Sequence, residues 1–245
     1  MERSLIFIHG ITGNPNDSWI RRERDKSDSH GRDESVIDPP LKARKLIHPT
    51  AHHKREWIRE EVWPRDLLLK TIPNVRVLNY GYDVSSQRLR QGMNKNILSD
   101  IAWELLIRME SLRRSEPLRP LLFVAHSLGG ILVEEVLRIS RRCDMQRVHL
   151  HCIFQSTVGI VFFGMPHAGT GSCGSLHRTA ENVETAGYST NEQVADTFLP
   201  SIEQLEELFE EFKLMAQQKK WAISSLQDKY GVKGLNGRKV YSPTS

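Results

Sequence analysis

The 245-residue chain has few cysteines and no long apolar run. Its three cysteines, Cys143, Cys152 and Cys173, are odd in number and form no CxxC pair, which excludes a disulfide framework or a zinc knuckle and favours reduced intracellular thiols. No stretch approaches the roughly 18 consecutive apolar residues of a membrane span. Near the N-terminus only Leu5–Ile8 is apolar, which is shorter than the apolar region of a signal peptide. The sequence predicts an intracellular protein, soluble or peripheral at a membrane.

The chain also lacks a large excess of charge of either sign. There are 34 basic and 30 acidic residues, a formal net charge of +4. Nucleic-acid binding requires a clustered basic face, so no nucleic-acid partner is predicted. With 39% hydrophobic and 26% charged residues, the composition is that of an ordinary globular domain.

Short apolar runs alternate with amphipathic segments along the chain. The apolar runs predict four buried strands, at Leu5–Ile8, Val75–Tyr80, Leu121–Ala125 and Val158–Phe163. The amphipathic segments predict three helices, at Ile97–Arg113, Leu128–Arg141 and Ser201–Lys220, the last with Ser201 as its N-cap. This alternation predicts the α/β class, with a mostly parallel sheet and flanking helices.

A long polar insertion, Trp19–Glu61, separates the first two predicted strands. We expect a surface loop, partly helical near His53–Glu61. Three of its histidines, His48, His52 and His53, could bind a metal ion, but no cysteine or spaced carboxylate completes a site, so no metal is predicted. The segment Gly169–Gly174 fits G-x-G-x-x-G but opens no nearby helix, so neither a dinucleotide nor any other cofactor is predicted.

The segment Leu121–Leu132 is typical of a nucleophile elbow, in which a serine lies on a sharp turn between a strand and a helix. Ser127 would be the nucleophile. The residues two before and two after it must be small, and Ala125 and Gly129 are. The Leu128 N–H would lie at the start of the helix, where it can stabilise an oxyanion.

The first predicted strand runs into His9-Gly10, a pattern that can supply the other half of an oxyanion hole. Gly10 lets the backbone turn, and the next N–H, of Ile11, can face a carbonyl oxygen. His9 could be a base, but a loop-positioning role is favoured. His126 is likewise expected to position the loop rather than to react.

The chain resembles the α/β-hydrolase lipases and esterases. Within them it is similar to a lipase-like group that includes the serine-active-site-containing proteins associated with phosphatidylglycerol remodelling and the N-terminal hydrolase-like domains of fungal NACHT-type signalling proteins. Five blocks carry this resemblance in the family's order: FIHGITGNPNDSW at Phe7–Trp19, WPRDLL at Trp63–Leu68, NVRVLNYGYD at Asn74–Asp83, FVAHSLGG at Phe123–Gly130 and GIVFFGMPHAGT at Gly159–Thr170. The resemblance implies an acyl-ester or lipid substrate, Ser127 as nucleophile, Ile11 and Leu128 as oxyanion donors, and a location in the cytoplasm or at the mitochondrion or endoplasmic reticulum.

The family pattern breaks at the acid and the histidine that should follow the serine. The last histidine is His177, which could act as a substitute base. His167 is expected to position a loop. The acidic residues between Ser127 and His177 are poorly placed, since two belong to the helix behind the elbow and one to its far end: Glu134, Glu135 and Asp144.

We therefore expect a C-terminally truncated hydrolase-like domain over residues 1–220 and an unmatched tail over 221–245. The sheet would then lack its last strands, and Val158–Phe163 would be an apolar edge that the tail or a protein partner must cover. Two functions remain open: a serine ester hydrolase, or a catalytically impaired module that binds a partner within a larger signalling protein.

Overall fold

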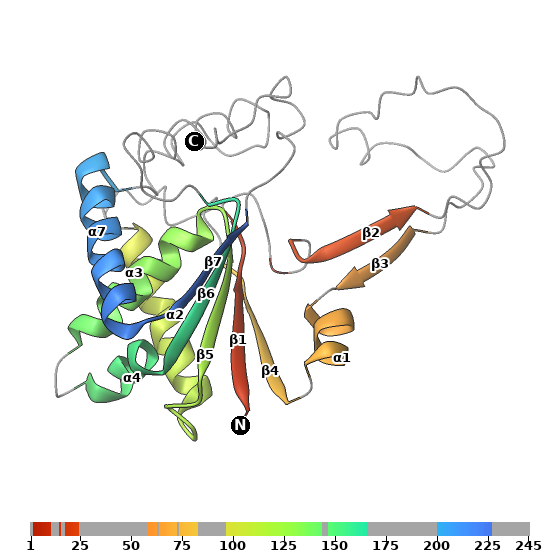
Figure 1. Cartoon of the computed structure of the whole chain (residues 1–245), viewed down its shortest axis with the longest axis horizontal. Helices are drawn as coiled ribbons and strands as arrows, with labels where there is room; N and C mark the ends of the chain where they lie inside the picture. Colours follow the sequence, from red (N-terminus) through yellow and green to blue (C-terminus); the bar gives the residue numbers. More distant parts are fainter. Residues whose placement is uncertain are drawn as a thin grey trace.

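A computed structural model of the chain describes residues 2–10, 15, 18–24, 58–62, 64–72, 74–82, 97–143, 147–165 and 200–226. Their centre is a five-stranded sheet, in which all pairs are parallel and the order is β4-β1-β5-β6-β7 (Figure 1). Its strands are β1 (Arg3–Ile8), β4 (Val75–Tyr80), β5 (Leu121–His126), β6 (Thr157–Phe163) and β7 (Ala222–Leu226). The predicted α/β class, with a parallel sheet and flanking helices, is confirmed.

The three predicted helices are present within one residue of their expected ends. They are α2 (Ile97–Arg113), α3 (Gly129–Arg142) and α7 (Ile202–Lys219). A fourth, α4 (Val148–Ser156), was not predicted. It passes into β6 with no glycine or proline between them, so the sequence shows no boundary there. The Thr157 hydroxyl donates to the Ile153 carbonyl at 2.7 Å and helps to end the helix.

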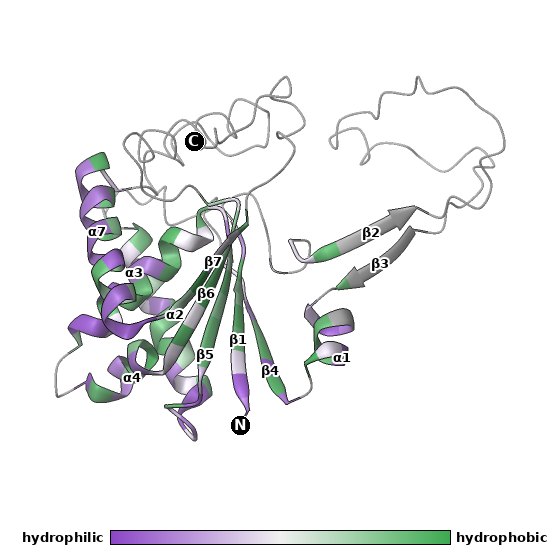
Figure 2. Ribbon diagram, in the orientation of Figure 1, coloured by the Kyte–Doolittle hydropathy of each residue, from purple (hydrophilic) through white to green (hydrophobic). Residues whose placement is uncertain are grey.

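Helices α2, α3, α4 and α7 lie together on one side of the sheet (Figure 1). The main core forms between them and alternate strand residues, among them Ile8, Phe123 and Phe162, which are fully buried. The apolar colouring of the strands in Figure 2 matches this placement. Buried apolar area is the main favourable term in folding, at about 25 cal/mol per Å².

A smaller cluster lies on the opposite face of the sheet. Phe7, Val124 and Trp19 are buried there, and the Phe7 and Trp19 rings meet edge to face with centroids 5.1 Å apart. Trp19 begins the polar insertion, so this contact holds the start of the insertion against the sheet.

Within the insertion the structure gives an antiparallel pair of strands, β2 (Ile20–Arg24) and β3 (Ile58–Val62). The expectation of helix near His53–Glu61 is wrong for residues 58–61, which pair in register with β2. Residues 25–57 lie outside the described part. A π-helical turn, η2 (Pro64–Leu68), and a short α1 (Leu69–Thr71) lead from β3 to β4.

The sheet continues one strand beyond the point that the sequence indicated. β7, from the expected tail, pairs with β6 along the register Gly159↔Ala222 to Phe163↔Leu226. Of the alternatives expected for the β6 edge, coverage by the tail is therefore the one observed. The segment Ala222–Leu226 has two serines and weak apolar patterning, so its strand conformation comes from pairing with β6 rather than from a local signal.

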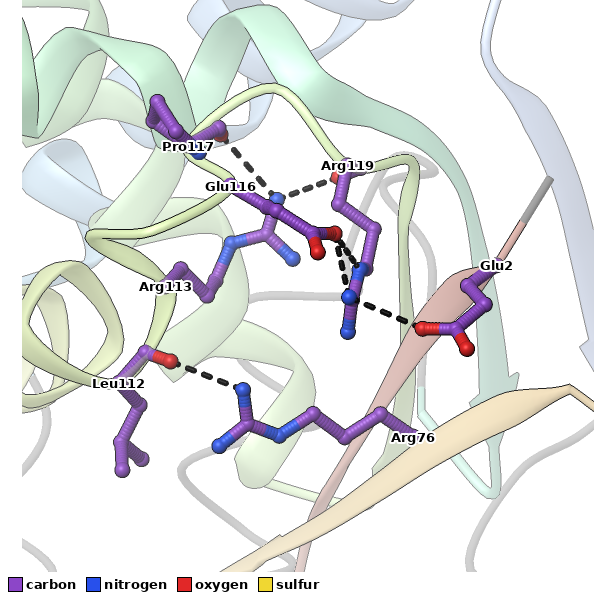
Figure 3. Close-up of polar contacts among 7 residues, drawn as sticks. All are labelled: Glu2, Arg76, Leu112, Arg113, Glu116, Pro117 and Arg119. Carbon is purple, nitrogen blue, oxygen red and sulfur yellow. Dashed lines mark hydrogen bonds and ion pairs between the residues drawn. The ribbon is translucent and has the colours of Figure 1, made fainter.

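A cluster of arginines ties the amino-terminal end of the sheet to the end of α2 (Figure 3). Arg113 is buried, and its Nη2 donates to the carbonyls of Pro117 and Arg119 and to Ser156 Oγ. Arg119 in turn forms ion pairs with Glu116 and, at 2.9 Å, with Glu2. These contacts fix the connection into β5 at the end of the strand farthest from Ser127.

Among the described residues, no helix is both long enough and apolar enough to cross a membrane.

Candidate functional site

Ser127 lies between β5 and α3 with φ 51°, in the left-handed region that non-glycine residues rarely adopt. Two backbone hydrogen bonds hold it there. Its N–H donates to the Phe163 carbonyl at 2.8 Å, and its carbonyl accepts from the Gly130 N–H at 2.9 Å. The serine thus sits on a sharp strand-to-helix turn that is anchored to the end of β6.

Small residues around the turn are required by close backbone packing. A Cβ at Gly129 would lie 2.5 Å from the His9 carbonyl oxygen and 2.8 Å from that of Ile8. A Cβ at Gly130 would lie 2.0 Å from Met165 Sδ. Ala125 is fully buried in the core. The steric demand expected from the sequence therefore has a specific origin, the end of β1 pressed against the start of α3.

The end of β1 also lies directly beside Ser127. β1 and β5 are parallel neighbours with Ile8 paired to Ala125, so the chain leaves both strands at the same end of the sheet. A Cβ at Gly10 would come 3.0 Å from Ser127 Cβ and 3.1 Å from His126 Nδ1. The two sequence motifs, which are far apart in the chain, are in contact in the fold.

His9 is completely buried, and both ring nitrogens have backbone partners. Its Nδ1 lies 2.7 Å from the Gly10 carbonyl oxygen, and its Nε2 accepts from the Tyr82 N–H at 3.2 Å. This arrangement requires the neutral tautomer with the proton on Nδ1. Burial lowers the pKa of His9 below 6.5, with the nearby His126 adding to the effect and the Gly10 hydrogen bond opposing it. A ring so engaged has no free nitrogen with which to take a proton from Ser127.

Leu128 and His126 flank Ser127 in different ways. The Leu128 side chain is buried in the main core, and its residue immediately precedes α3. Among the described residues its N–H donates to no backbone carbonyl. An N–H at a helix start that is not used within the backbone is suited to receive negative charge. His126 is half-buried next to Gly10.

The two acidic residues of α3 are buried but differ in their partners. Glu135 accepts from Ser99 Oγ at 2.7 Å and pairs with Arg138 at 2.7 Å. Glu134 Oε2 has no hydrogen-bond partner among the described residues, and burial raises the pKa of this carboxyl well above its usual range. Neither carboxyl is paired with a histidine in the described part of the chain.

Several residues considered from the sequence lie outside the described residues. They are Ile11, His177, His167, Asp144, the histidines His48, His52 and His53, and the glycine-rich segment Gly169–Gly174. Within the ranges that are described, no group of three or more potential metal ligands is found. Tyr82, which contacts His9, was not singled out from the sequence, although it lies within the block Asn74–Asp83.

No family model matches the chain. Among curated proteins it is similar to Protein SERAC1 of Danio rerio, with 27% identity over 177 residues, and to Protein SERAC1 of Homo sapiens, with 27% identity over 173 residues. These matches cover 69% of this chain and 22% of each relative, so the chain spans about a fifth of the length of the curated relatives it matches. Among solved structures, a carboxylesterase of the thaumarchaeon Nitrososphaera gargenis aligns over 93% of this chain and 82% of its own, with 11% identity and a TM-score of 0.39.

Proposed function

We propose that this chain is a serine hydrolase of the α/β-hydrolase type that cleaves carboxylic esters, with Ser127 as the nucleophile. The observation that carries the proposal is the backbone of Ser127, a left-handed serine held at a strand-to-helix turn with Gly10 packed against it. Strained residues at such turns concentrate at functional sites, where the strain keeps the reactive group in place. The similarity to the SERAC1 proteins, which extends over 69% of this chain, supports the same conclusion.

In the proposed reaction, Ser127 Oγ attacks the ester carbonyl and forms a tetrahedral intermediate. The N–H groups of Leu128 and Ile11 stabilise the oxyanion. A general base takes the serine proton and returns it to the leaving alcohol, and water then releases the acyl group. His9 and His126 support the loops in this scheme, and His177 is the proposed base.

The end of β7 lies close to the serine turn. The Gly164 N–H donates to the Leu226 carbonyl at 2.8 Å, and the carbonyl of the neighbouring Phe163 accepts from the Ser127 N–H. For the acid that would orient the base we propose Asp228, the first carboxylate after β7 in the sequence.

The substrate class is inferred from the resemblance to lipases, which favours an acyl or lipid ester reached from the cytoplasm or from the surface of the mitochondrion or endoplasmic reticulum. The activity of the longer SERAC1 proteins is not carried over by this similarity. The expected domain boundary at residue 220, with a tail over 221–245, stays a prediction; we propose instead a boundary beyond Leu226, because β7 pairs with β6 in the central sheet.

A fluorophosphonate probe tests the proposal directly, because it labels only an activated serine. We expect the folded chain to be labelled and Ser127→Ala to abolish labelling. Ester hydrolysis should fall by about 10⁴-fold or more, the usual cost of losing the nucleophile. Ser224→Ala, on the exposed strand β7, is the matched control and should keep the labelling.

The alternative function is a hydrolase-fold module that binds a protein partner, including as part of a NACHT-type signalling protein. It is favoured by one observation, that His9, the buried histidine beside the serine turn, has both ring nitrogens engaged by backbone groups and cannot act as the base. A folded wild-type chain that resists the probe and hydrolyses no ester would support this alternative and contradict the enzyme.

A further inference from the structure

The contacts of His9 draw attention to Tyr82. β1 and β4 are parallel neighbours with Ile8 paired to Tyr80, so the chain leaves both strands at the same end of the sheet. Tyr82, two residues after Tyr80, lies beside His9. β5 brings Ser127 to the other side of the same turn. The segment His9-Gly10 is therefore held between Tyr82 and Ser127.

Tyr82 makes three separate contacts with His9. Its backbone N–H donates to His9 Nε2 at 3.2 Å, and its hydroxyl donates to the His9 carbonyl at 2.8 Å. The two rings are stacked, with centroids 4.4 Å apart and planes only 7° from parallel. Both the side chain and the backbone of His9 are thus fixed by one residue.

These contacts determine which hydrogen bond His9 can make to Gly10. Because the Tyr82 N–H occupies Nε2, the imidazole proton must be on Nδ1, from which it is donated to the Gly10 carbonyl at 2.7 Å. Gly10 packs directly against Ser127. The orientation of the Gly10 peptide beside the serine is consequently set by His9, and that of His9 by Tyr82.

We propose that Tyr82 is a positioning residue for the ester-cleaving site, which clamps the His9-Gly10 turn against Ser127. This inference rests on the proposed function. Tyr82 itself touches no reacting atom in this scheme. Its contribution is to keep the Gly10 peptide in place while negative charge develops on the carbonyl oxygen of the ester. Hydrogen-bond donors that are held in position need no reorganisation during the reaction.

The test compares Tyr82→Phe with Tyr80→Phe. The first removes the hydroxyl that donates to the His9 carbonyl but keeps the stacked ring and the backbone N–H. The second makes the same chemical change two residues earlier, in a ring of the main core. We expect similar melting temperatures for the two variants. Only Tyr82→Phe should react more slowly with a fluorophosphonate. We expect its labelling rate at saturating probe to fall by about tenfold, while the probe concentration that gives half of the maximal rate stays the same.

Backbone NMR provides a readout that does not depend on activity. In Tyr82→Phe we expect the amide signals of Gly10 and Ser127 to shift and broaden relative to those in Tyr80→Phe. Unchanged signals, or a labelling rate equal to that of the wild type, would overturn the clamp even if the enzyme is active. A wild-type chain that is not labelled would contradict the proposed function and the catalytic purpose of the clamp, while the NMR comparison would still decide whether Tyr82 holds the turn.

A second variant, His9→Asn, keeps the test meaningful if Tyr82→Phe destabilises the chain. Asparagine can donate to the Gly10 carbonyl from roughly the position of Nδ1, but it has no acceptor at the position of Nε2. With the clamp broken from the other side, we expect the same change in the Gly10 signal and a similar loss of labelling rate. If the signal and the rate of His9→Asn both match the wild type, Tyr82 does not act through His9.

Discussion

Ser127 shows how much a single residue depends on its surroundings. Its left-handed backbone costs about 1–3 kcal/mol, and such a conformation persists only where neighbouring contacts determine it. Here those contacts are the hydrogen bond to Phe163 and the close approach of Gly10. The same neighbours that impose the strain also bring the proposed oxyanion loop to the serine, so conformation and proposed chemistry have a common origin.

Glu134 is the residue whose burial has the clearest consequence for stability. Above about pH 4.5 the unfolded chain releases this proton, whereas the folded chain retains it because burial raises the pKa of the carboxyl. The folded state then binds more protons than the unfolded state. This residue therefore makes the free energy of unfolding fall as pH rises above 4.5, up to the higher pKa of the folded state.

Glu134→Gln should remove this dependence. We expect urea unfolding to give a gain of about 1–3 kcal/mol at pH 8 relative to the wild type, with little difference near pH 4. Glu135→Gln is the matched control, since its carboxylate pairs with Ser99 and Arg138 and its loss should destabilise the fold. A Glu134→Gln variant that is less stable than the wild type at pH 8 would show that this carboxylate has a favourable partner.

At the scale of elements, α7 has both ends defined by local contacts. Ser201 and Gln204 form a capping box, in which the Gln204 N–H donates to Ser201 Oγ at 3.3 Å and the Ser201 N–H to Gln204 Oε1 at 3.1 Å. Lys220 ends the helix in the left-handed conformation, with φ 53°. The helix thus places Trp221 and β7 where they join the sheet.

Ser201→Ala should lower the free energy of unfolding by about 1 kcal/mol, because the first turn loses the acceptor for one of its N–H groups. Ser201→Asp keeps an acceptor at the N-cap and should unfold close to the wild type. Chemical denaturation of the three proteins measures the difference. Equal stability of Ser201→Ala and the wild type would mean that solvent replaces the cap without cost.

At the scale of the whole molecule, β7 pairs with the edge of β6 that would otherwise be exposed. Trp221 is buried against Phe154 and Phe212, with ring centroids 5.6 Å and 5.9 Å away, so the start of this segment is packed into the core. An unpaired apolar strand is a template for aggregation. The segment over 221–226 therefore contributes to the stability of the molecule as well as to its topology.

A chain that ends at Lys220 should aggregate or lose cooperative unfolding, while one that ends at Leu226 should retain it. Circular dichroism melts and size-exclusion chromatography of the two distinguish the cases. A monomeric, cooperatively folded chain of residues 1–220 would place the domain boundary where the sequence suggested it.

The sequence by itself determined the α/β class, four strands, three helices, the N-cap at Ser201 and the two motifs around His9 and Ser127. Each of these depends on local patterning: apolar runs, helical periodicity, and small residues flanking a serine. The tertiary structure alone decided that His9 is locked between Tyr82 and Gly10, that Gly129 must be small because it meets the backbone of Ile8 and His9, and that Ala222–Leu226 is a strand. These features depend on neighbours from distant parts of the chain, which the parallel sheet brings together and which no local pattern specifies.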